Sequence, residues 1–448
     1  MVKRLPLLFR HITYNLRGGF LVRPLIIALT LGCLGAILSW IEESVNGFGR
    51  WLPAVLFPSN ADPQVAQVIL SDIAGSIMTV VSIVFAILLM TLTLASMQFS
   101  PRIIVSFAKD RVTQWTLGVF LGTFSYCMAA LPAARSLPHP FAPVGTVAGA
   151  MLLALACVCW LLFFIHHISH AISVSYIVDR IASETEDVIR DVMPWQRALR
   201  RLPDEHALPA EDCETPILAG TSGYIRFIDL RRLVAVAKSC HVKVYVVRRV
   251  GQFVPQGTPL MLVHHGDRLS GVDKGELSGA FDLGPSRTLQ QDVEFGVLQI
   301  VDIALKAISP AVNDPSTAVN CVDQLSRILI LFASRENPPS LLYEPPGVAR
   351  VRLHWIDFDG LLTSAFEQIR LYSKTDIAVS LRLLRALSDI ASTTACLDFR
   401  RSLFELGRRI VEGCAERLGA QELMPMKARL AGLEKMVSEE SLATDEHE

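Results

Sequence analysis

The chain has 448 residues and a mean hydropathy of +0.40, with 51% hydrophobic and 19% charged residues. Soluble domains carry about 25% charged residues, so part of this chain is expected to lie in lipid rather than in water. Its formal net charge of −1 argues against nucleic acid as a partner, because phosphate binding needs a dominant basic surface.

Four apolar segments in the first part of the chain are each long enough to cross a bilayer. They are residues 24–41, 73–97, 112–134 and 141–165. A spanning helix needs about 20 apolar residues to cross about 30 Å of hydrocarbon. The sequence therefore predicts a membrane protein with a four-helix transmembrane domain, residues 1–178, in contact with the lipid bilayer.

Positive charge near the ends of the spans predicts the orientation of the chain. Basic residues gather before the first span and between the second and third spans: Lys3, Arg4, Arg10, Arg17, Arg23, Arg102, Lys109 and Arg111. Such residues mark the cytoplasmic side of a membrane. Both termini are therefore expected in the cytoplasm.

The second span carries a stripe of small and polar residues at helical spacing. Its members are Asp72, Ser76, Thr79, Ser82, Ala86, Thr93 and Ser96. If several copies of the chain surrounded an axis, this stripe would line a pore, and Asp72 would attract cations near its outer mouth. The alternative is that the stripe packs against neighbouring helices or bonds to its own backbone. The sequence leaves both interpretations open.

Two other spans carry pairs of glycines four residues apart. Gly118 and Gly122 lie in the third span, and Gly145 and Gly149 lie in the fourth. Glycines at this spacing let two helix backbones approach closely in lipid. The close contact is expected either within one subunit or between subunits.

Three histidines, His166, His167 and His170, follow the fourth span. His166 and His170 share a helix face, but no carboxylate or cysteine at ligand spacing accompanies them, so no metal site is predicted. Nine cysteines without a Cys-x-x-Cys pair likewise indicate no zinc site. The fourth helix is expected to run on through the next residues, with 179–215 as a coupling helix and linker, and no cofactor is expected.

A small β-rich cytoplasmic subdomain is predicted over residues 216–284. Residues 222–228, 242–248 and 260–264 alternate as strands, and 230–240 reads as a helix capped by Asp229. The turn between Gly251 and Gly257 resembles that of barrel-sandwich domains such as biotinyl carriers, so a β-barrel-like unit is expected. The Met-Lys pair that would be modified is missing, which argues against a carrier role.

Residues 285–448 are predicted to be mainly helical, which makes the cytoplasmic part an α+β domain. An apolar helix over 295–308 breaks at residues 309–318, and Asp314 followed by Pro315 then opens a helix that ends near Ala333. Polar groups gather at this break: Asn313, Asp314, Ser316 and Thr317. They form either a site for an anion or small polar ligand at two buried helix ends, or a structural corner.

No catalytic motif is present. The sequence has no P-loop, no Gly-x-Ser-x-Gly, no His-Glu-x-x-His and no Gly-x-Gly-x-x-Gly. Asp292, Glu294 and Asp302 near Arg287 are interpreted as helix caps and solvated side chains rather than as an acid cluster. We therefore expect a protein that is not an enzyme.

Several phrases of the chain resemble one bacterial family of predicted membrane proteins, named after domain of unknown function 2254. They are Gln98-Phe-Ser-Pro-Arg, Asp110-Arg, Leu117-Gly-Val-Phe-Leu-Gly-Thr-Phe, Gly223-Tyr-Ile, Arg287-Thr-Leu-Gln-Gln-Asp-Val-Glu-Phe-Gly and Ile308-Ser-Pro-Ala-Val-Asn-Asp-Pro-Ser-Thr-Ala. The resemblance implies four spans and a bacterial inner-membrane location, and it implies no reaction.

Two functions remain open at this point. The first is a homo-oligomeric ion-conducting pore lined by the second span and gated by the cytoplasmic domain. The second is a membrane-anchored ligand-sensing or scaffold module without a pore, in which the spans only tether and dimerise.

Overall fold

The computed structural model describes residues 22–44, 62–98, 111–135, 140–171, 173–193, 214–335, 340–344 and 348–445. Contacts divide the chain into two units, Met1–Ser173 and Val174–Glu448. The first holds the apolar helices and is called the membrane unit. The second is called the C-terminal unit.

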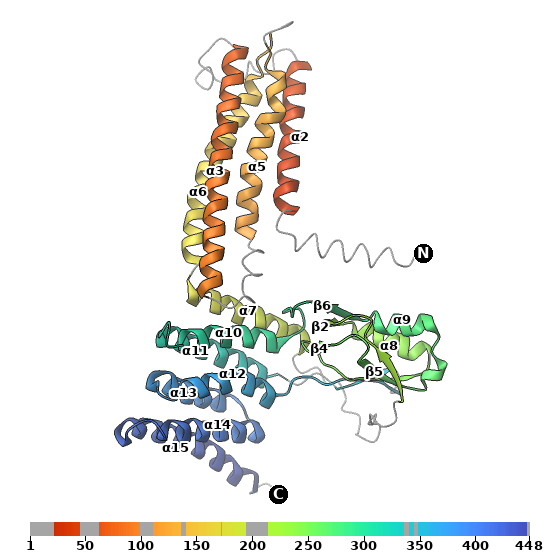
Figure 1. Cartoon of the computed structure of the whole chain (residues 1–448), viewed down its shortest axis with the longest axis vertical. Helices are drawn as coiled ribbons and strands as arrows, with labels where there is room; N and C mark the ends of the chain where they lie inside the picture. Colours follow the sequence, from red (N-terminus) through yellow and green to blue (C-terminus); the bar gives the residue numbers. More distant parts are fainter. Residues whose placement is uncertain are drawn as a thin grey trace. The chain divides into compact units, whose positions relative to one another are not determined.

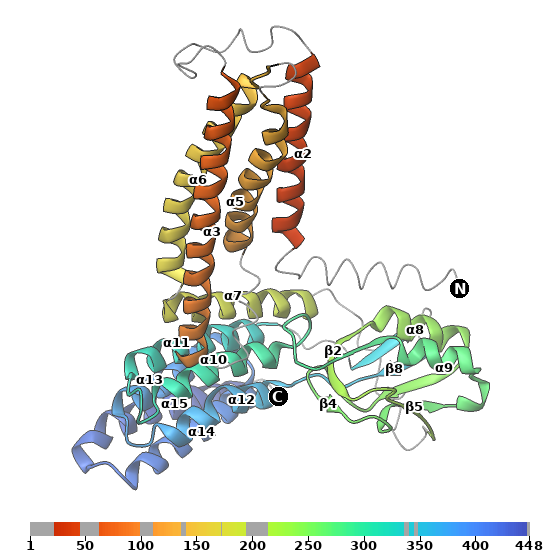
Figure 2. The same ribbon diagram turned by 45° about the horizontal axis from the view of Figure 1, so that its top comes forward.

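The membrane unit contains the four apolar helices that the sequence predicts (Figures 1 and 2). They are α2 (Val22–Ser44), α3 (Pro63–Gln98), α5 (Arg111–Ala130) and α6 (Val144–Ala171), and η3 (Leu131–Ala133) extends α5. Helix α5 contacts each of the other three. It is accordingly the most buried of the four, with 50% of its candidate span buried against 17% for α3.

Close packing of α2 against α5 depends on glycine. A Cβ atom on Gly118 would lie 2.5 Å from Cδ1 of Ile27, and one on Gly35 would lie 2.6 Å from the carbonyl oxygen of Tyr126. A Cβ on Gly122 would similarly overlap Leu31. Contacts under 3 Å leave no room for a side chain, so the small residues of α5 serve packing within one chain.

The N-terminus of α6 is held by a buried carboxylate from α2. Glu42 is 7% exposed and accepts hydrogen bonds from the backbone N–H groups of Gly145 at 2.6 Å and Thr146 at 3.0 Å. The Thr146 hydroxyl adds a third bond at 3.0 Å. A negative charge at this end of a helix is favourable, because the first N–H groups have no partner within the helix.

The C-terminal unit contains two separate β-sheets. A five-stranded sheet has the order β1 (Thr215–Leu218), β5 (Pro259–His264), β3 (Lys243–Val246), β8 (Val348–Arg352), β7 (Leu341–Glu344). A three-stranded sheet has the order β4 (Phe253–Val254), β2 (Gly223–Ile228), β6 (Phe281–Gly284). Strands β3 and β8 are parallel, and the other pairs are antiparallel.

The expectation of a barrel-like unit is wrong, because the described strands form no closed barrel. Strands β7 and β8 come from beyond residue 340 and extend the sheet at β3, so it stays open. Helices α8 (Leu230–Ser239) and α9 (Gly271–Ser278) lie beside this sheet (Figure 2). Leu233 and Ala237 of α8 share a core with Val244, Val246 and Val263 of the sheet.

The remaining helices of the C-terminal unit stack in antiparallel pairs (Figure 1). The pairs are α10 (Val293–Ala307) with α11 (Pro315–Ala333), α12 (Phe358–Tyr372) with α13 (Ile377–Thr393), and α14 (Leu397–Ala415) with α15 (Ala420–Asp445). Each helix also contacts its counterpart in the next pair, so the stack is built like a short helical solenoid. Helix α7 (Val174–Val192) packs on the first pair.

Aspartates begin most of these helices. Side chains of Asp292, Asp314, Asp357 and Asp376 each accept a hydrogen bond from a backbone N–H in the first turn of α10, α11, α12 and α13. Removing such a cap costs about 1 kcal/mol. One expectation about the helices is wrong: the fourth span does not run on as a single helix, since α6 ends at Ala171 and α7 begins at Val174.

Candidate functional site

The polar stripe of the second span lies on the outside of the membrane unit. Asp72, Ser76, Thr79, Ser82, Ala86 and Thr93 are all exposed, and the side chain of Ser96 lies outside the described residues. The buried residues of α3 recur every three, four or seven positions and form the opposite face: Ala66, Leu70, Ala74, Ile77, Val84 and Thr91. Helices α5 and α6 pack against that buried face.

Three hydroxyl groups of the stripe bond to their own helix. Thr79 donates to the carbonyl of Gly75 at 3.1 Å, Ser82 to Met78 at 2.9 Å, and Thr93 to Leu89 at 2.8 Å. These bonds satisfy the donors without a neighbouring helix. Each oxygen keeps an unused acceptor position that faces outward, so the stripe can still bind water or a cation.

Gly75 and Asp72 distinguish this face from the rest of the membrane unit. A Cβ atom on Gly75 would meet nothing within 4 Å, whereas several glycines of α2, α5 and α6 lie against a neighbouring helix. Asp72 lies within the candidate span Pro63–Thr91, and among the described residues it has neither a hydrogen bond nor an ion pair. The sequence prediction placed Asp72 at the edge of the span because it began that span at Ile73.

The second predicted site, at residues 313–317, is an exposed corner between α10 and α11. Asn313 is exposed with φ of 50°, a left-handed conformation that asparagine tolerates well. Asp314 accepts hydrogen bonds from the backbone N–H of Thr317 at 3.1 Å and from its hydroxyl at 2.6 Å. Ser316 is exposed. The two helix ends are therefore not buried as expected, and capping accounts for the polar contacts that the structure records there.

A charged network that the sequence prediction treated as caps and solvated side chains is largely buried. Arg287 donates to both oxygens of Asp292 at 2.7 and 2.8 Å and to Glu294 at 3.0 Å. Glu294 also accepts from Arg249 at 3.1 Å and Ser364 at 3.0 Å. The side chains of Asp292, Glu294 and Arg287 are only 3%, 16% and 15% exposed. Asp292 does cap α10, as expected, but it is not solvated.

The network balances two positive against two negative charges. Burial raises the pKa of Glu294. The charges of Arg249 and Arg287 and the hydrogen bonds from Arg287 and Ser364 lower it by more than burial raises it, so the pKa of Glu294 lies below its usual range. Burial lowers the pKa of Arg287, and its bonds to Asp292 and Glu294 raise it above its usual range. Glu294 and Arg287 are thus held in their charged forms. The network connects Arg249, in the turn after β3, to the first turn of α10, and Ser364 connects it to α12.

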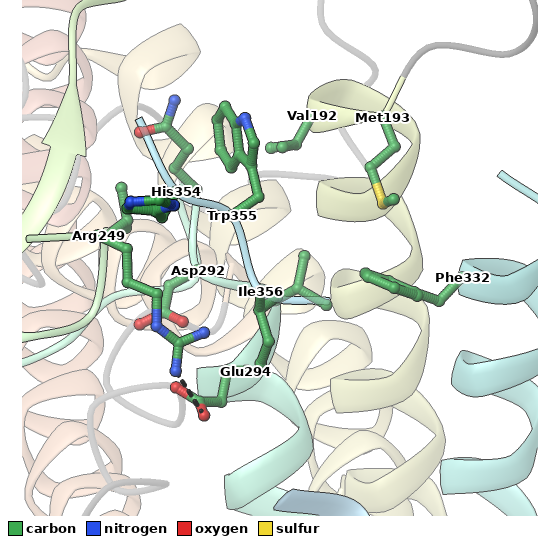
Figure 3. Close-up of a pocket in the computed structure, with 12 residues that line it drawn as sticks. Val192, Met193, Arg249, Asp292, Glu294, Phe332, His354, Trp355 and Ile356 are labelled. Carbon is green, nitrogen blue, oxygen red and sulfur yellow. Dashed lines mark hydrogen bonds and ion pairs between the residues drawn. The ribbon is translucent and has the colours of Figure 1, made fainter. Parts of the chain in front are cut away.

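A pocket of about 30 Å³ adjoins this network (Figure 3). Arg249 and Glu294 form one side, with Met193, Phe332, His354 and Trp355 around them. Ligand pockets usually enclose about 300–1,000 Å³, whereas a single water needs roughly 10–15 Å³. The pocket therefore has room for water beside the ion pairs and not for a metabolite. Among the described residues, no cluster of three or more metal-ligating side chains is present.

Comparison with known proteins places the chain in one family. A family model described as "Predicted membrane protein (DUF2254)" matches residues 17–389. Uncharacterised proteins of Mycobacterium bovis and Mycobacterium tuberculosis are each 30% identical to the chain over 415 residues, which cover 91% of this chain and 78% of each relative. No solved structure matches the chain. The matched segment extends from the first span into α13.

Proposed function

Since the chain belongs to the DUF2254 family of predicted membrane proteins, we propose that several copies of it assemble around α3 to form an ion-conducting pore in the bacterial inner membrane. In this proposal both termini and the C-terminal unit lie in the cytoplasm, where that unit gates the pore. The proposal assigns no chemical reaction to the chain.

The orientation of the α3 stripe carries this proposal. Its six described members face away from the other helices of the chain, and the hydroxyls among them keep outward acceptor positions. The carboxylate of Asp72 is costly to expose to lipid, whereas around a shared axis it and the hydroxyls would meet water. Gly75, beside which the chain leaves open space, would permit a close approach between copies.

Cations are the permeant class that fits this stripe. Asp72 is its only charged member, and serine and threonine oxygens offer further acceptors along the helix. A ring of carboxylates at one level of a symmetric pore favours cations and disfavours anions. In this arrangement Asp72 would act as a selectivity residue near the outer mouth.

Cysteine accessibility tests the proposal directly. Thr79→Cys and Ser82→Cys are made separately in a chain whose nine native cysteines are replaced by alanine or serine. Each is then treated in liposomes with a charged, membrane-impermeant thiol reagent. A pore predicts rapid modification at both positions, because only water brings such a reagent to the middle of a span.

The matched control is Leu155→Cys on α6, which is 62% exposed in the chain and belongs to an apolar surface. It should resist the reagent because it faces lipid. Protection of Thr79→Cys and Ser82→Cys equal to that of Leu155→Cys would refute the pore. The mass and symmetry of the purified complex give a second criterion, since a monomer has no symmetry axis and the two α3 helices of a dimer are too few to enclose a pore.

A further inference from the structure

Helix α7 is packed into the C-terminal unit along one whole face. Its buried residues recur at helical spacing: Ile177, Val178, Ile181, Ala182, Thr185, Glu186, Val188 and Ile189. This face contacts both helices of the first pair, α10 and α11. Six of these residues are aliphatic, and removing their side chains from water holds α7 against the stack.

The contact between α7 and α10 is unusually close. A Cβ atom on Gly296 would overlap the side chain of Thr185, which is fully buried and donates its hydroxyl to the carbonyl of Ile181 at 2.7 Å. Only glycine leaves enough room for the two helices at this distance. The position of α7 on α10 is therefore determined at one point along the helix rather than free to slide.

Helix α11 fixes α7 through one arginine. Arg327 donates to both carboxylate oxygens of Glu186, at 2.6 and 3.0 Å, and to Asp179 at 2.9 Å. Glu186 is 8% exposed, and this bidentate geometry is the strongest form of an arginine–carboxylate pair. Arg190, one turn further along α7, donates to the same carboxylate at 2.9 Å. These contacts and the Gly296 contact are together called the α7 clamp.

The same kind of contact recurs through the stack. Arg382 of α13 pairs with Asp323 of α11, and Arg429 of α15 donates to the carbonyl of Leu381 in α13 at 2.8 Å. Each second helix of a pair thus sends an arginine back to the layer before it. Helix α7 therefore forms the first layer of the stack and is expected to move with it.

We infer that α7 transmits the position of the C-terminal unit to the last membrane helix. Only residues 172 and 173 separate the end of α6 at Ala171 from the start of α7 at Val174. A displacement of the stack would carry the clamped α7 with it, and two residues of chain connect α7 to α6. The consequence for function rests on the proposed pore: there, the α7 clamp is the route by which the C-terminal unit gates the pore.

Hydrogen exchange of the full chain in nanodiscs tests the clamp without any assumption about conductance. In the wild type, amides of α7 should be as protected as those of α10 and α11. Arg327→Gln and Glu186→Gln should each speed exchange within Val174–Val192 by at least about tenfold, because each removes the bidentate ion pair that joins α7 to α11. Exchange in the candidate span Pro63–Thr91 should not change.

Arg408→Gln is the matched control. Arg408 also binds two carboxylates, Glu405 and Glu412, but all three lie on the exposed face of α14. It should leave α7 unaffected. Asp179→Asn, which removes only the more exposed partner of Arg327, gives a milder variant that retains the Glu186 pair. An α7 that exchanges freely in the wild type, or equally in wild type and Arg327→Gln, overturns the clamp.

Conductance in planar bilayers then tests the transmission. If the wild type conducts, Arg327→Gln and Glu186→Gln should change its open probability several-fold and leave single-channel conductance unchanged, while Arg408→Gln alters neither. Identical gating in all variants overturns the transmission. A wild type that shows no conductance refutes the proposed pore, whereas the exchange data still decide the clamp.

Discussion

Glu294→Gln is the most informative single change in the C-terminal unit. The carboxylate of Glu294 accepts hydrogen bonds from Arg287, Arg249 and Ser364 at 3.0, 3.1 and 3.0 Å, and its side chain is 16% exposed. The amide keeps the size of the side chain and one acceptor oxygen but removes the charge. The three charged groups that remain, Arg249, Arg287 and Asp292, then carry one uncompensated positive charge in a largely buried place.

The magnitude follows from this geometry. Removing one partner of a buried ion pair costs about 3–5 kcal/mol. Arg249 is 26% exposed and Arg287 keeps both bonds to Asp292, so we expect a smaller loss of about 2–3 kcal/mol. For a unit of this size, such a loss lowers the apparent Tm by about 4–12 °C.

Thermal unfolding of the full chain in detergent, followed by circular dichroism at several pH values, measures this effect. The folded-state pKa of Glu294 is depressed, so its contribution is fully present above the unfolded pKa of about 4.3 and is lost as the pH falls through the folded value. The difference in Tm between the wild type and Glu294→Gln should therefore become smaller below about pH 4.

Glu405→Gln is the control for the same substitution on the surface. Glu405 pairs with Arg408 on the exposed face of α14, where solvent screens the pair, so its Tm should match that of the wild type. Equal Tm values for Glu294→Gln and the wild type at pH 7, or a gap that widens on acidification, would refute the reasoning.

Three further predictions concern the membrane unit and the helix corner. Gly35→Ala should destabilise the protein by about 1–3 kcal/mol in thermal unfolding, because its Cβ would lie 2.6 Å from a backbone oxygen of Tyr126, whereas Gly75→Ala meets nothing within 4 Å in the chain and should leave the unfolding of a single chain unchanged. Asn313→Gly should leave Tm unchanged, because glycine adopts the φ of 50° freely, whereas Asn313→Val should lower stability by about 1–2 kcal/mol. In bilayers, Asp72→Asn should weaken cation over anion selectivity, measured as the reversal potential in a salt gradient, and an unchanged potential would exclude Asp72 from the conduction path.

Periodic and capped segments were predictable from the sequence. Apolar length alone identified all four membrane helices, and Asp314 followed by Pro315 placed the start of α11 at the residue where it begins. Helix α3 shows the limit of this approach. It begins ten residues before the predicted span, at Pro63, because Asp62 accepts the N–H of Gln64 at 2.9 Å and opens the helix. The sequence prediction began the second span after Asp72, although this charged residue lies inside α3.

Long-range pairing was not predictable. The strands β7 and β8 lie about 100 residues beyond β3, and no local pattern indicates that β3 pairs in parallel with β8. The buried network was missed for a similar reason. The spacing of Asp292 and Glu294 fits a helix cap, and only the fold brings Arg249 and Ser364 onto the same carboxylate. Burial of a charge depends on its partners, and these lie 45 and 70 residues away in the sequence.

Asp72 sets a stricter condition on the membrane unit than the hydroxyls of the stripe do. Thr79 and Ser82 can face lipid at small cost, since each donates its proton to a carbonyl of its own helix. A carboxylate has no proton to donate, and the backbone N–H groups near it are already bonded within α3, so its own helix offers it nothing. A charged group costs about 2.5–3.5 kcal/mol in lipid at the centre of a span and less toward its ends, and Asp72 lies in the first half of the candidate span Pro63–Thr91. Water or a protein donor must therefore reach Asp72 from outside the described part of the chain, and in the proposed assembly of copies around α3 water would reach that face.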